Sequence, residues 1–295
     1  MNSGVVISNI HEISAIYYAL LQCGYDYYSI EREQKHIAQI KHFVGCGSAT
    51  DFFSYVKQNS CEVYPYWPRA FILETACFFL RSGHTDFSNF ENFQKCIMDT
   101  DNISKSEKDD VFWKWIKNFP TAIHKVLSDK SFQHYLEWEN YWLSVQNDKY
   151  RKQLQEINQF VDICIYRYHS PVTQLKIVLN PIKCVYAADY HIHQNCFVFS
   201  SGKFQLESVI HEFLHHVVHP FVLLQKDIIL AQNMSNLDID NSYYLSGDNI
   251  GKLNAFEEYA VRSLTEDILK GKYPDDLSYS LCSILESKIR NKTNA

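Results

Sequence analysis

The residues His211-Glu212-Phe213-Leu214-His215 constrain this chain more than any other stretch of its sequence. On an α-helix, side chains four positions apart project from one face, so the two imidazoles can converge on a single ion. Apolar side chains flank the pattern on nearly every side: Val209, Ile210, Phe213, Leu214, Val217 and Val218. Burying two histidines and a glutamate among them is costly unless these groups are paired or bind a metal. The stretch therefore predicts a buried helix that binds a metal ion.

The glutamate between the two histidines is expected to play a different role. Glu212 projects about a quarter-turn away from them on the helix. Its carboxylate is then free to hold a water on a zinc ion and to act as a general base. Two further histidines follow: His216 points off the face of the pair, and His219 precedes Pro220, where we expect the helix to end or kink. We interpret both as ordinary polar or capping residues.

A catalytic zinc needs three protein ligands and an open position for water, so the third ligand must come from elsewhere. The arrangement HExxHxxGxxH is excluded, because it requires glycine at 218 and histidine at 221 and this chain has valine and phenylalanine there. The downstream helix offers the adjacent carboxylates of Glu257 and Glu258. They project about 100° apart, so only one can face the metal. The apolar stripe of that helix borders both residues and leaves the choice open.

An HExxH helix followed some tens of residues later by Glu-x-(Phe/Tyr)-Ala resembles the gluzincins, a superfamily of zinc metallopeptidases that includes thermolysin and anthrax lethal factor. The matching residues are Glu257-Glu258-Tyr259-Ala260, and the likeness covers about residues 173 to 269. It implies Zn²⁺ bound by His211, His215 and Glu257, with Glu258 as the alternate third ligand. One departure is position 261, where several members carry an acidic residue that orients a zinc histidine and this chain has valine.

The same resemblance implies hydrolysis of peptide bonds in a peptide or protein substrate, with Glu212 as the catalytic base. It also implies that the strand before the HExxH helix, at 195–200, is an edge strand that pairs with the extended substrate. Hydrolysis develops an oxyanion that a tyrosine or histidine must meet in addition to zinc. The candidates are Tyr243, Tyr244 and His193. Packing and a surface hairpin are their alternative roles.

The sequence predicts an α+β fold that is mostly helical. Apolar and aromatic residues recur at helical spacing within 13–21, 71–79, 112–119 and 132–142. The third of these ranges follows a capping box that begins at Ser104. The texture changes near Tyr168: strands are expected at 173–179 and 195–200, a helix at 204–219, a loop at 233–251 and a helix at 252–270. We predict a helical domain over 1–165. A zincin-like metallopeptidase domain with a small sheet and an active-site helix is expected over 166–295.

Composition narrows the setting of the protein. The formal charge of −6 gives no overall attraction to nucleic acid or to anionic membranes. No window holds about 18 consecutive apolar residues, so no membrane span is expected. The first 24 residues lack the basic start and unbroken apolar stretch of a secretory signal. Nine cysteines without a CxxC pair are typical of reduced thiols. We expect a cytoplasmic protein.

Two other functions are alternatives to the peptidase hypothesis. The chain could be a catalytically weak or inactive zinc-binding protein whose helical half binds a partner. It could also hydrolyse a non-peptide amide with the same metal. Catalytic groups in a sequence do not separate these readings, because a fold and a site type do not fix the substrate.

Overall fold

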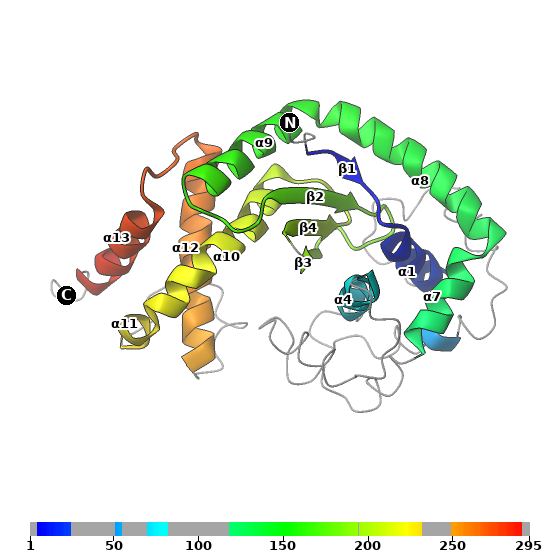
Figure 1. Cartoon of the computed structure of the whole chain (residues 1–295), viewed down its shortest axis with the longest axis horizontal. Coiled ribbons are helices and arrows are strands. Elements are labelled where there is room, and N and C mark those ends of the chain that lie inside the picture. The colour runs from blue at the N-terminus through cyan, green and yellow to red at the C-terminus, as the bar shows by residue number, and fades with distance from the viewer. Residues whose placement is uncertain are drawn as a thin grey trace.

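The computed structural model describes residues 5–24, 51–54, 70–81, 118–193, 195–231 and 249–290. Its helices are α1 (His11–Gln22), α4 (Ala70–Arg81), α7 (Phe119–Leu127), α8 (Lys130–Lys149), α9 (Arg151–Tyr166), α10 (Leu206–Leu224), α11 (Lys226–Leu230), α12 (Asn249–Leu269) and α13 (Leu277–Arg290). Its strands are β1 (Ile7–Ser8), β2 (Gln174–Leu179), β3 (Ala188–His193) and β4 (Cys196–Ser201). The described chain is mostly helical with one small sheet, as the sequence predicted (Figure 1).

The four strands form one mixed sheet in the order β1-β2-β4-β3. β1, β2 and β4 run parallel, and β3 runs antiparallel to β4. β2 and β4 match the two predicted strands, whereas β1 was not predicted. β3 pairs antiparallel with β4, in agreement with the hairpin considered for His193. The expectation that 195–200 forms the edge strand is wrong, because β4 pairs with β2 on one side and with β3 on the other. Within the described residues, the edge on that side is β3.

Helices cover both faces of the sheet. One face packs against α9, α10 and α12 through side chains such as Ile177, Phe197 and Phe199. The opposite face packs against α1, α4 and α8 through Val178 and Val198. Figure 1 shows α8 and α9 arching over the sheet, with α10 and α12 to one side of it and α1, α4 and α7 to the other. Both hydrophobic cores and the β1–β2 pairing include residues from before and after residue 165, the predicted domain boundary.

The two helices that matter most for the site are α10 and α12, which pack against each other. α10 was expected to end at His219, but it continues through Pro220 to Leu224. A proline lacks an N–H donor and therefore costs the helix one hydrogen bond without ending it here. α12 begins at Asn249, three residues before its predicted start. Among the described helices, none combines the length and apolar character that crossing a membrane requires.

Some expectations fall on residues that the structure does not describe. The predicted helix after Ser104 is one of them, apart from Phe119, which begins α7. Most of the predicted loop at 233–251 is another.

A cluster of buried polar side chains joins β3 to α1 and α4. We call it the Lys183 network, and its members are Tyr17, Glu74, Lys183, Asp189, His191 and Ser200. The Lys183 amino group donates to Glu74 at 2.9 Å, to Asp189 at 2.6 Å and to Ser200 at 3.0 Å. Burial acts to lower the pKa of Lys183, but the Asp189 and Glu74 carboxylates outweigh this effect and raise the pKa. Lys183 therefore stays charged in the interior.

Glu74 is the member that connects the helices to the strand. Its side chain is fully buried on α4. One carboxylate oxygen accepts a hydrogen bond from the Tyr17 hydroxyl at 2.6 Å, and the other lies 2.9 Å from Nε2 of His191. Burial acts to raise the pKa of Glu74, but Lys183 and His191 hold the pKa at about 2. No periodic pattern reveals this cluster in the sequence, because its members come from α1, α4, β3, β4 and the connection between β2 and β3.

Replacing the buried lysine should strongly destabilise the fold. In Lys183→Met two buried carboxylates lose their cation, which we expect to lower the free energy of unfolding by about 3 to 5 kcal/mol. The control is Lys270→Met, which removes an exposed pair with Glu266 four residues away on α12 and should cost no more than about 0.5 kcal/mol. Urea denaturation measures both values. Equal effects of the two substitutions would contradict a structural role for the network.

Candidate metal centre

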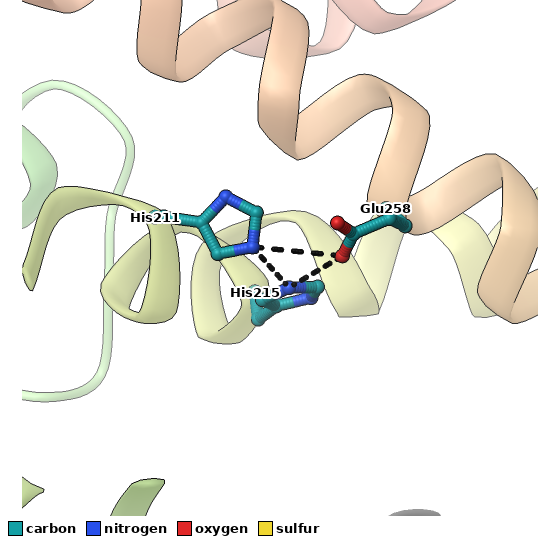
Figure 2. A group of neighbouring side chains, drawn as sticks. All are labelled: His211, His215 and Glu258. Atoms are coloured by element: carbon teal, nitrogen blue, oxygen red, sulfur yellow. Dashed lines mark hydrogen bonds and ion pairs between the residues drawn. The ribbon is translucent and has the colours of Figure 1, made fainter. Parts of the chain in front are cut away.

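Three potential ligand atoms from two helices converge at one point (Figure 2). Nε2 of His211 and Nε2 of His215, both on α10, lie 3.2 Å apart. Oε2 of Glu258, on α12, lies 3.5 Å from the first nitrogen and 3.3 Å from the second. Within the described part of the chain, this is the one group of histidine, cysteine and acidic side chains placed to hold a metal ion. The residues of this group can hold a metal ion.

Local helix geometry and packing explain this convergence. The two histidines are four residues apart on α10 and so lie on one face, while the apolar residues that flank them are buried as expected. On α12, buried Phe256, Ala260 and Val261 belong to the same core as α10. Their packing turns the two glutamates toward the histidines. The ligand side chains remain partly accessible, with exposed fractions of 20% for His211, 18% for His215 and 7% for Glu258.

The structure brings Glu258 into the ligand group in place of Glu257, the third ligand that the sequence analysis preferred. Oε1 of Glu257 lies 2.9 Å from Nδ1 of His215, which is the other nitrogen of that ring. Oε2 of Glu257 lies 2.7 Å from Nδ1 of His219. In this structure the alternate third ligand, Glu258, therefore completes the group of potential ligand atoms. The apolar stripe of α12 borders both glutamates, and only the packing against α10 separates them.

Glu257 and Arg262 contact atoms of His215 and Glu258 that lie outside the ligand group. A carboxylate that accepts a hydrogen bond from Nδ1 of a histidine leaves the lone pair of Nε2 directed at a metal. Glu257 lies 2.9 Å from Nδ1 of His215 and is therefore placed to orient that ring. The Nε donor of Arg262 lies 2.6 Å from Oε1 of Glu258, which leaves Oε2 for the ligand group. His219, interpreted from the sequence as an ordinary polar residue, contacts Glu257.

The electrostatics of the group suit a cation. Burial acts to raise the pKa of Glu258, but hydrogen bonds with His211 and His215 hold it well below its usual range. Burial acts to lower the pKa of His215, but hydrogen bonds with Glu257 and Glu258 raise it to about 10. The carboxylates of Glu257 and Glu258, whose pKa values are both lowered by the histidines, therefore stay ionised and face these imidazoles. Metal binding at such a site displaces the protons that the histidines otherwise carry.

Glu212 lies on α10 between the two histidines and is not part of the ligand group, as the sequence analysis expected. Burial raises its pKa to about 7, although the nearby His215 and His211 act in the opposite direction. A carboxyl group with a pKa near neutrality can both accept and release a proton at physiological pH. That property suits a general base that later returns its proton.

The candidate oxyanion donors are only partly described. Tyr243 and Tyr244 lie outside the described residues. His193 lies on β3, where its ring centroid is 5.8 Å from that of Phe78 on α4, and it does not belong to the ligand group. His216 contacts the Ser170 hydroxyl through Nε2 at 3.3 Å, in keeping with its expected role as an ordinary polar residue.

Comparisons of this chain with models of known protein families, with curated proteins and with solved structures give no match. A proposal about function therefore depends on the chemistry of the site itself. The gluzincin resemblance remains an expectation from the two short motifs.

Replacing each of the two adjacent glutamates in turn should show which one is a metal ligand and which one orients a ligand. Glu257→Ala should weaken metal binding by about 10- to 100-fold, the usual cost of losing a carboxylate behind a metal-binding histidine. Glu258→Ala removes a ligand atom and should weaken binding further. Competition with a chromophoric chelator measures both affinities, and Glu266→Ala, an exposed position on α12, is the control. A larger loss in Glu257→Ala than in Glu258→Ala would return Glu257 to the ligand position.

Proposed function

We propose that this chain is a zinc-dependent metallopeptidase in which Glu212 is the general base. The observation that carries the proposal is the spacing of the three ligand atoms. A tetrahedral zinc with ligands at about 2.0 to 2.2 Å separates its ligand atoms by about 3.3 to 3.6 Å. The three observed separations are 3.2, 3.3 and 3.5 Å. Two histidines and one glutamate are also the donor set of several catalytic zinc sites.

Three protein ligands leave one position of a tetrahedral ion open for chemistry. A zinc ion held there would polarise a water molecule and a substrate carbonyl, which makes the water a better nucleophile. His211, His215 and Glu258 would hold the ion, and Glu257 and Arg262 contact two of these side chains and would fix their orientation. Glu212 accepts the proton that the attacking water loses and passes it to the amine nitrogen that leaves. Its pKa of about 7 supports both steps.

The position of β3 supports an extended peptide as the substrate. β3 is the edge strand on its side of the described sheet, and it lies against α10, the helix that carries the two histidines. An extended peptide can add to a sheet edge through backbone hydrogen bonds, with its side chains in alternating pockets. The substrate-pairing role that the resemblance implies for 195–200 therefore belongs to β3.

Glu212→Gln tests the base. The substitution keeps the size of the side chain and leaves all three ligands in place, so zinc content should stay the same. Hydrolysis should fall by at least about 100- to 10,000-fold, because the proton acceptor is gone. Metal analysis and turnover are measured on one preparation, with Glu207→Gln, an exposed position in the first turn of α10, as the control. Unchanged turnover would exclude Glu212 as the base.

Removal of the metal tests the reaction class. Purified protein should cleave members of a broad fluorogenic peptide library, 1,10-phenanthroline should abolish cleavage, and added Zn²⁺ should restore it, because loss of the ion removes the polarising charge. Zinc bound at one ion per chain with no cleavage of any library peptide would count against the peptidase. That result would favour the zinc-binding protein or the hydrolase of a non-peptide amide.

A further inference from the structure

The Lys183 network has no part in the proposed chemistry, yet it is built around the strand that we assign to the substrate. β3 contributes two members, Asp189 and His191, which are two residues apart and therefore lie on the same face of the strand. The face of α4 packs against them, with the Phe78 ring centroid 4.9 Å from that of His191. β3 is thus held laterally by β4 and on one face by charged groups from elsewhere in the chain.

Because the network is buried, its contacts restrict the position of β3. Lys183 and Glu74 are 0% exposed, and Asp189 and His191 are 6% and 7% exposed. A shift of β3 by one residue would move both of its network side chains to the opposite face of the sheet. Lys183 and Glu74 would then lose partners in an interior where unpaired charges are expensive. The network therefore fixes the register of β3 and its position relative to α4.

The strand held in this way lies beside the metal-binding helix. β3 contacts α10, and Tyr190 of β3 packs against the same hydrophobic core as the apolar side chains of α10, with its ring stacked on that of Phe197 at 5.0 Å. The network and the candidate site are therefore neighbours on either side of one strand. Movement of β3 relative to α10 would change where a peptide on β3 meets the metal.

We propose that Glu74 is a positioning residue for the substrate. Acting through Lys183 and His191, it fixes β3 at the place where an extended peptide pairs with the outer edge of the strand. This inference rests on the proposed peptidase function. It means that α4, far from the metal ligands in the sequence, sets the affinity for the peptide without touching it.

The test compares Glu74→Gln with Glu139→Gln. Glu139 is an equally buried glutamate on α8 whose hydrogen bonds go to Asn9, Ser14, Tyr135 and Asn180, none of which lies on β3. In Glu74→Gln the KM for a cleaved library peptide should rise at least about tenfold with kcat changed less than about threefold, since affinity is lost uniformly. Zinc affinity should not change, and amide exchange at residues 188–193 should become faster. Glu139→Gln should leave KM and this exchange as they are.

Each outcome separates this inference from the function on which it rests. No peptide cleavage by the unaltered protein would overturn the proposed function and this inference together. Cleavage with an unchanged KM in a folded Glu74→Gln variant would overturn the inference alone, as would an equal rise of KM in Glu139→Gln. If Glu74→Gln fails to fold, Tyr17→Phe removes only the hydroxyl that donates to Glu74 and should raise KM about two- to threefold. An unchanged KM in that variant would also overturn the inference.

Discussion

The packing of α12 against α10 places two adjacent buried glutamates beside three histidines, and the candidate site depends on this contact. Neither helix holds a metal site alone: α10 supplies two imidazoles, and α12 supplies the carboxylate that closes the group. The neighbouring carboxylate of Glu257 lies 2.9 Å from Nδ1 of His215, the ring nitrogen outside the ligand group, and is therefore placed to orient this ring. A rotation of α12 about its axis would move Glu258 away from the two histidines of the ligand group and Glu257 away from Nδ1 of His215.

Two clusters of buried ionisable groups therefore organise this protein. One is the ligand group between α10 and α12, and the other is the Lys183 network between β3, α1 and α4. In both, charged side chains lie in direct contact with partners of opposite charge or with imidazoles, which is the condition under which charge is tolerated in an interior. They differ in accessibility, because the ligand group keeps some exposure and the Lys183 network has almost none. That difference suits chemistry at the first and positioning at the second.

The sheet connects these clusters and shows what sequence patterns miss. β-branched and aromatic content predicted β2 and β4 to within a residue. Strand order was not predictable in the same way, because it depends on which segments pair across long separations in the sequence. β1 is only two residues long and comes from the region expected to be wholly helical. β3 carries two histidines, an aspartate and a tyrosine in six residues, so its composition is unusually polar for a strand. Asp189 and His191 are nevertheless buried, because they contact Lys183 and Glu74.

The sequence by itself determined which helix carries the candidate metal site, because the four-residue spacing of His211 and His215 fixes their common face whatever the helix packs against. It also placed Glu212 outside the ligand group for the same reason. Only the tertiary structure decided between Glu257 and Glu258, since that choice depends on the rotation of α12 relative to α10. It likewise decided which strand is the edge and brought Glu74 to β3. Local periodicity contains no information about such contacts, because they join residues that the chain alone holds far apart.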